Sequence, residues 1–387
     1  MGVVAYLKGR TRLWQVAGLW TGVLLLGFNL YAAASVYAPQ YRFRNDFRLL
    51  YGAAHLVAAV GYHLLYDLDL QRQVVVDEGF IWQPFINPPP LVWLGTPFSL
   101  PPFAVAVWLW TAFLLLSAVL AWRLAAPGDR LGRAMLLALL AGFFPTAFSV
   151  MVGQVVFVIA AAVALAWWLG EERRDTLAGV ALSALVLKPQ VALLVPLCLL
   201  AAGRRRIFAG WLVTTLAIAA LSALLLGADG IRRYADVLNL ASQWTLTRRF
   251  TLTDVAGSGT LLTALRASVL ALGLAAAYQA RDRGTAVPIA AGIVASLLFT
   301  PYVGLQDMTM LVVAGWLILR AGAPAWLAVL LAAGYAVLEF ALVVQTWPVV
   351  LLEAALLASL IAWSPDRRVG SHLFEPLAAA RQEAGGL

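Results

Sequence analysis

Long apolar runs separated by short polar clusters dominate the chain. Most of the runs are long enough, or nearly long enough, to cross a hydrocarbon core of about 30 Å as a helix. They fall at residues 13–36, 102–122, 134–151, 154–170, 176–187, 190–202, 207–227, 259–280, 286–300, 308–320, 324–345 and 347–363. The pattern predicts an all-α polytopic membrane protein with about twelve transmembrane segments.

Some of these runs are too short to cross the membrane at right angles, namely 176–187, 190–202 and 308–320. Short or broken helices are tolerated in a bilayer where they face protein or a water-filled cavity. Lys188 and Pro189 separate the first two runs, and proline interrupts a helix. We therefore expect several broken segments around a cavity that opens toward the non-cytoplasmic side.

The distribution of charge sets the expected topology. Hydrophobic residues make up 63% of the chain and charged residues 12%, which excludes an ordinary soluble globule. The net charge of +8 arises mostly from arginines clustered at the ends of apolar runs, as the positive-inside rule requires, and does not indicate nucleic-acid binding. Neighbouring clusters bracket an outward and a return passage, so both termini are expected in the cytoplasm.

This topology predicts the domain organisation. Residues 1–364 are expected to form one transmembrane domain and residues 365–387 a short cytoplasmic tail. The external loops 37–101 and 228–258 are expected to cover the active site, and the proline-rich segment 82–102 is typical of a loop with short interfacial pieces.

The first external loop carries a helical pattern from about Phe47 to Val60. Arg48, Tyr51 and His55 recur on one face of this segment, and much of the remainder is apolar. Such a pattern suits a helix that lies in the membrane interface.

Asp46 precedes this helix and has two interpretations. It stands where an N-cap belongs. Alternatively, a carboxylate at the water–membrane boundary can take a proton from an incoming hydroxyl, with Arg44 and Arg48 offering positive charge to an anionic leaving group.

Lys188 also has two interpretations. It is an isolated charge in an apolar stretch, next to a proline. Its ammonium can extend to lipid headgroups at the membrane surface, or it can act as a compact positive charge on a phosphate.

Other polar residues on the external side remain open between structural and functional roles. Gln154 belongs to a tight turn with Gly153 or contacts substrate. Asn87 forms an Asx-type turn or touches sugar, and Asp67 caps a helix or binds acceptor hydroxyls. Glu339 and Glu353 lie within membrane segments, where ionisable residues are functional candidates.

The order of short motifs along residues 40–310 resembles glycosyltransferase family 87, within the multispanning GT-C glycosyltransferases. The matching pieces are Asn45-Asp46-Phe47 with Tyr51 and Ala53-Ala54, Leu65-Tyr66-Asp67, Asn87-Pro88-Pro89-Pro90, Gly153-Gln154, Lys188-Pro189, and Thr300-Pro301-Tyr302 followed by Asp307. Some family variants carry a histidine after the Ser/Thr-Pro pair, and this chain does not; Asp307 is either its substitute or a helix cap.

The resemblance implies a GT-C-like bundle and a polyprenyl-phosphate monosaccharide donor, mannose-like, whose sugar passes with inversion to a lipid or glycan hydroxyl. Asp46 is then the expected base. The expected donor-phosphate residues are Lys188, Arg44 and Arg48. The expected sugar or acceptor contacts are Asn45, Tyr51, His55, Asp67, Asn87, Gln154, Gln190 and Asp307.

No cofactor or metal is expected, because the Asp67-Leu68-Asp69 spacing is a weak metal signal in an acidic loop. We expect a monomer in the cell membrane, with the site facing the exterior. The alternatives are a transporter or translocase of a lipid-linked sugar, which predicts internal repeats and charges near mid-membrane, and a non-catalytic partner of cell-envelope machinery, which leaves Asp46 dispensable.

Overall fold

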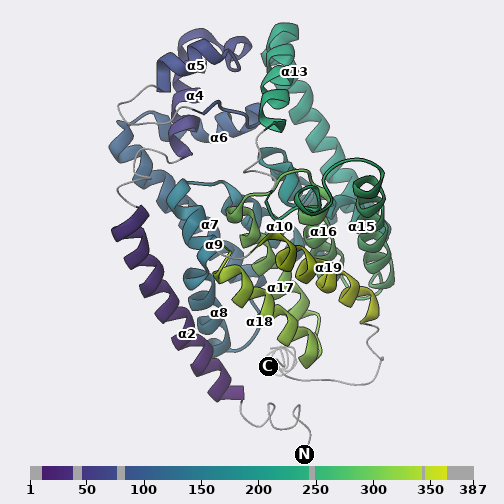
Figure 1. Ribbon diagram of the computed structural model, residues 1–387. Helices are drawn as coiled ribbons and strands as arrows, with labels where there is room; N and C mark the ends of the chain where they lie inside the picture. Colours follow the sequence, from purple (N-terminus) through teal and green to yellow (C-terminus); the bar gives the residue numbers. More distant parts are fainter. Residues whose placement is uncertain (1–10, 38–45, 76–82, 244–248, 342–344, 364–387) are drawn as a thin grey trace, which may run out of the picture.

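The fold was analysed in a computed structural model, which describes residues 11–37, 46–75, 83–243, 249–341 and 345–363. Within these ranges every regular element is a helix. Figure 1 shows the helices packed into one bundle, with α2 (Thr11–Ala32) running along one side beside α8 (Arg130–Gly142). The predicted all-α class is therefore confirmed.

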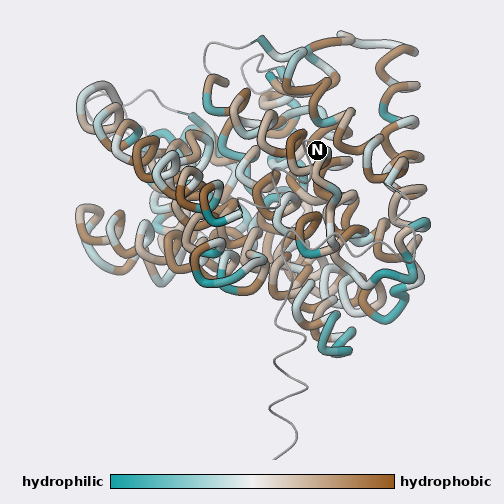
Figure 2. The backbone as a smooth tube through the Cα atoms, turned by 90° about the horizontal axis from the view of Figure 1, so that it is seen from below, coloured by the Kyte–Doolittle hydropathy of each residue, from teal (hydrophilic) through white to brown (hydrophobic). Residues whose placement is uncertain are grey.

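Four described helices are long and apolar enough to cross a membrane, or five if one bent pair counts as a span. They are α2 with its π-helical extension η1 (Ala33–Tyr37), α7 (Phe103–Ala125), α13 (Arg205–Ser242) and α15 (Thr260–Gln279). Hydrophobic positions dominate the helices in Figure 2, and hydrophilic ones gather in short stretches. The helices support a membrane protein, but the structure does not support a count of twelve spans.

The remaining α-helices are shorter, and several of them meet at breaks. They are α4 (Phe47–Val60), α5 (Leu68–Val75), α6 (Pro89–Ser99), α9 (Phe144–Val152), α10 (Val156–Glu171), α11 (Asp175–Leu182), α12 (Val195–Ala201), α14 (Leu252–Ala256), α16 (Ala286–Phe299), α17 (Met310–Arg320), α18 (Ala325–Glu339) and α19 (Thr346–Ala362). The expected short pieces in 82–102 thus include an eleven-residue helix, α6.

The apolar run 134–151 is not one straight helix. It divides into α8 and α9, which are bent by 56°. Pro145 occupies the first turn of α9, where its missing N–H costs nothing. Both carboxylate oxygens of Glu339 accept from the amide of Phe144, at 3.1 and 3.2 Å, so Glu339 satisfies a donor that the break exposes.

The external loop expected at 228–258 is largely helical. Helix α13 continues through a kink at Gly227, whose φ of 63° lies in the left-handed region, and ends at Ser242. Its last turns reach the end of the molecule where α4, α5 and α6 lie (Figure 1). There Arg233 pairs with Asp67, which joins this part of α13 to the first loop.

Helix α16 forms the centre of the bundle. All but the last of its residues are buried, and it packs against α12, α15, α17 and α19. Its approach to α12 depends on Gly292, because a Cβ there would lie 2.5 Å from the Cα of Val195. The short helix α12 is therefore shielded by protein on this side, as a broken segment in a membrane requires.

Candidate active site

Asp46 lies immediately before α4, whose bounds, Phe47–Val60, match the prediction. Its side chain makes no capping hydrogen bond, so the cap interpretation is wrong for the carboxylate. The backbone amide of Asp46 donates to the carbonyl of Val152 at 2.6 Å. This bond ties the start of α4 to the end of α9, and the half-buried carboxyl is left for other contacts.

Gly153 and Gln154 form the predicted tight turn after α9. Gly153 has φ 76° and ψ 34°, a left-handed conformation that glycine adopts without steric cost. The amides of both residues donate to the carbonyl of Ser149 at 3.0 Å. The indole of Trp110 donates to the carbonyl of Gly153 at 2.8 Å, so the turn is held from two sides.

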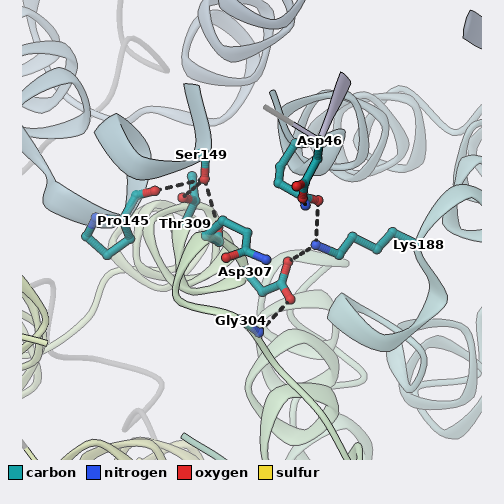
Figure 3. Close-up of polar contacts among 9 residues, drawn as sticks. Asp46, Pro145, Ser149, Lys188, Gly304, Asp307 and Thr309 are labelled. Atoms are coloured by element: carbon teal, nitrogen blue, oxygen red, sulfur yellow. Dashed lines mark hydrogen bonds and ion pairs between the residues drawn. The ribbon is translucent and has the colours of Figure 1, made fainter. Parts of the chain in front are cut away.

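Lys188 lies at the predicted break, between the 3₁₀ turns η3 (Ser183–Leu187) and η4 (Pro189–Val191). The lysine is only 5% exposed, so its ammonium does not extend to the membrane surface. Nζ donates to Oε1 of Gln154 at 2.9 Å and forms an ion pair with Asp307 (Figure 3). The lysine charge is thus compensated inside the protein.

Asp307 belongs to the 3₁₀ helix η6 (Leu305–Thr309), and its second oxygen accepts from the amide of Gly304 at 3.0 Å. It therefore caps η6 while it pairs with Lys188. A serine fixes η6 against α9: the hydroxyl of Ser149 lies 2.8 Å from the carbonyl of Pro145 and 3.2 Å from the hydroxyl of Thr309 (Figure 3).

Gln154 completes the chain of contacts. Its Nε2 donates to Oδ2 of Asp46, while its Oε1 accepts from Lys188. Four segments distant in sequence thus meet through Asp46, Gln154, Lys188 and Asp307. We call these four residues the polar chain. Burial raises the pKa of the Asp46 carboxyl to about 6, against the lowering effects of the Lys188 charge and the Gln154 hydrogen bond.

The polar face of α4 points to a different neighbourhood. The Arg48 guanidinium lies 5.0 Å from the ring centroid of Phe103, and the hydroxyl of Tyr51 donates to the carbonyl of Pro101 at 3.1 Å. The ring of exposed His55 lies 4.5 Å from that of Tyr51. These three predicted residues therefore gather at the start of α7.

Asp67 acts as the predicted cap. Its Oδ1 accepts from the amides of Asp69 and Leu70, at 3.1 and 3.0 Å, and its Oδ2 pairs with Arg233. Both of its oxygens are thus engaged away from the polar chain.

The other predicted contacts lie at partly buried positions, Asn87 just before α6 and Gln190 within η4. The backbone carbonyl of Asn87 accepts from the hydroxyl of Tyr66 at 2.7 Å. Arg44 and Asn45 lie outside the described residues.

Glu353 is buried, and neither of its carboxylate oxygens has a hydrogen-bond partner among the described residues. It lines an otherwise mostly apolar cavity of about 480 Å³, together with side chains of α2, α8, α17 and α18. The cavity is lined by none of the four residues of the polar chain.

Three residues that support the site were not predicted: Trp110, Ser149 and Thr309. Ser149 offered a signal, because it is a polar residue inside the apolar run 134–151. Trp110 lies within a continuous apolar run and gave none. Within the ranges that the structure describes, no group of three or more His, Cys, Asp or Glu residues is placed to hold a metal ion.

Comparison with known proteins identifies the family of the chain. No curated protein and no solved structure matches the chain. The sequence profile of glycosyltransferase family 87 matches residues 85–301, which include Gln154 and Lys188 and exclude Asp46 and Asp307. Because the match covers more than half of the 387 residues, the chain belongs to glycosyltransferase family 87 and is a membrane glycosyltransferase of the GT-C type.

Proposed function

We propose that the protein transfers a mannose-like monosaccharide from a polyprenyl-phosphate donor to a hydroxyl of a lipid or glycan acceptor, with Asp46 as the general base. The observation that supports this most directly is the state of the Asp46 carboxyl. Oδ2 is held by Gln154, whereas Oδ1 accepts no hydrogen bond from a described residue and the side chain is half-buried. A carboxylate of this kind has one oxygen fixed and one available to a substrate.

The proposed step is a single displacement. The acceptor hydroxyl gives its proton to Oδ1 of Asp46, and its oxygen forms a bond to the anomeric carbon. The bond from that carbon to the phosphate oxygen breaks, and the phosphate takes the electron pair and leaves as polyprenyl phosphate. Attack opposite to the leaving group inverts the anomeric configuration.

The departing phosphate needs positive charge. Lys188 uses two of its three ammonium donors on Gln154 and Asp307, which leaves one for a phosphate oxygen. Arg48, two residues after Asp46 in the first turn of α4, is the second proposed contact, and this role requires its guanidinium to turn from the ring of Phe103 toward the donor. We further propose His55, Asn87 and Gln190 as sugar or acceptor contacts, because none of their side chains caps a helix or forms an ion pair within the part of the chain that the structure describes.

The membrane arrangement is part of the same proposal. The arginine clusters support a topology with both termini in the cytoplasm and the polar chain toward the exterior. In this arrangement α4, α5 and α6 and the last turns of α13 cover the site, and the Asp67–Arg233 pair joins them (Figure 1). A transporter remains the alternative, but the polar chain joins loops and breaks rather than two matched halves.

A transfer assay with a panel of donors tests the proposal. Purified protein should transfer sugar from polyprenyl-phosphate hexoses and not from nucleotide sugars, and the product anomer should be inverted relative to the donor. Use of nucleotide sugars, or retention of configuration, would exclude this mechanism. Movement of intact donor across a vesicle membrane without transfer would favour the transporter instead.

A further inference from the structure

Gln154 bridges a cation and a carboxylate through the two ends of one amide group. Its neighbour on one side, Lys188, has donors and no acceptor. Its neighbour on the other side, Asp46, has only acceptors when ionised. The amide must therefore turn its oxygen to Lys188 and its nitrogen to Asp46, as the contacts show.

The Lys188–Asp307 pair fixes this orientation. The side chains of Lys188 and Asp307 are 6% and 2% exposed, so neither exchanges its partner readily for water. Asp307 is in turn anchored by the amide of Gly304, and η6 is anchored to α9 through Ser149. The orientation of Gln154 is thus determined by buried groups behind it.

Gln154 also separates a cation from a base. A lysine in direct contact with Asp46 would stabilise the carboxylate and weaken it as a proton acceptor. In the structure the lysine charge is directed to Asp307, and Asp46 receives a neutral donor instead. Among the described residues, Asp46 is therefore held in place by a neutral hydrogen bond and forms no ion pair.

We propose that Gln154 is a positioning residue for Asp46: held by the Lys188–Asp307 pair, it aims the free carboxylate oxygen at the acceptor hydroxyl and does not itself bind the sugar. This inference rests on the proposed function, because it assumes that Asp46 is the base. It replaces the expectation that Gln154 and Asp307 are sugar contacts.

Two ionisable groups on other segments lie close enough to affect the charge of Asp46. Lys188 and Asp307 act on its charge. Helix α6 carries no ionisable side chain, and the only one on α7, Arg123, is near its far end. The first loop contributes further described ionisable residues, which lie in α4, in η2 (Tyr62–Leu64), in α5 and at the position before α5. They are Arg48, Tyr51, His55, Tyr62, His63, Asp67, Asp69 and Arg72. Arg48 contacts Phe103, and Tyr51 contacts Pro101. His55 contacts Tyr51, and Asp67 pairs with Arg233.

The test compares Gln154→Met with Gln279→Met, at an exposed glutamine that ends α15, in the full-length protein. Methionine keeps the length of the side chain and removes the hydrogen bonds. In Gln154→Met, kcat should fall by about tenfold to a hundredfold, because a misaimed catalytic group loses that much. KM for donor and acceptor should change little. The acidic limb of kcat/KM should move to higher pH, because the hydrogen bond that favours the carboxylate is lost.

Asp307→Asn should shift the acidic limb of the kcat/KM profile in the opposite direction. Removing this negative charge should move the acidic limb to lower pH, because Asp307 raises the pKa of Asp46. Gln279→Met should leave the acidic limb at the wild-type position. The position of a limb does not depend on the fraction of folded protein, so partial loss of folding does not obscure the result.

The inference would be wrong if the acidic limb of kcat/KM does not move in Gln154→Met, or if KM rises strongly while kcat is unchanged. Either result would indicate that Gln154 binds the sugar. Failure of the proposed function gives a different result, namely transfer that persists in Asp46→Asn. The two failures are therefore distinguishable.

Discussion

Gln154 donates a hydrogen bond to the carboxylate of Asp46 across a separation of 108 residues. Gln154 belongs to the turn after α9, and Asp46 precedes α4. Their contact therefore joins the start of α4 to the end of α9. The backbone bond from Asp46 to Val152 holds the two segments at the same point. A base fixed through both its backbone and its side chain loses little entropy when a substrate arrives.

The pH dependence of transfer should report Asp46. Burial raises the pKa of its carboxyl to about 6, and only the carboxylate accepts a proton. We expect kcat/KM to be level above about pH 6 and to fall about tenfold per pH unit below it. The profile should be measured with saturating donor and varied acceptor. An acidic limb near the ordinary aspartate value of about 4 would contradict this assignment.

The close approach of α11 and α13 depends on glycine. A Cβ at Gly179 would lie 2.2 Å from the carbonyl oxygen of Ile207. Gly179→Ala should therefore destabilise the protein by about 1–3 kcal/mol, as overpacking does. Thermal unfolding in detergent measures the effect. Gly334→Ala is the matched control, since nothing lies within 4 Å of its Cβ position, and it should be neutral or slightly stabilising. Equal effects of the two variants would refute the packing argument.

Glu339 should stabilise the bend between α8 and α9. Glu339→Ala leaves the amide of Phe144 without its acceptor, and loss of such a cap costs about 0.5–2 kcal/mol. Glu339→Gln keeps an acceptor oxygen and should recover most of the stability. The exposed Glu172→Ala serves as the control, with an expected change within about 0.5 kcal/mol. If alanine and glutamine at 339 melt at the same temperature, the capping role is wrong.

Sugar transfer should not depend on a metal. The proposed mechanism stabilises the leaving phosphate with Lys188 and Arg48, so a chelator should leave the initial rate unchanged. Dialysis against EDTA, followed by assay with and without Mg²⁺ and Mn²⁺, measures this. A rate lost on chelation and restored by either ion would show that the cationic side chains are not sufficient.

The sequence predicted the features that have a local cause. The bounds of α4 follow from its periodic pattern, the break at Lys188 from the adjacent proline, and the turn at Gln154 from the preceding glycine. Asp46 stood out because it is a carboxylate next to an interfacial helix. The structure confirms the helix bounds, the break and the turn.

Features that depend on tertiary contacts were not predictable. The sequence of α8 and α9 is one apolar run, and Pro145 was the signal for its division. Gly227 was read as the end of a helix, although α13 only kinks there. The pairing of Lys188 with Asp307 joins segments that no pattern relates, and hydropathy alone counted every apolar run as a span.

Single-turnover sugar transfer by Asp46→Asn is the sharpest test of Asp46 as the catalytic base. The asparagine keeps the size of the side chain and still allows an amide contact with Gln154, so donor binding and thermal unfolding should match the wild type. The rate of sugar transfer should fall by about a hundredfold or more, the usual contribution of a general base. A rate within about threefold of the wild type, with donor bound normally, would contradict the account.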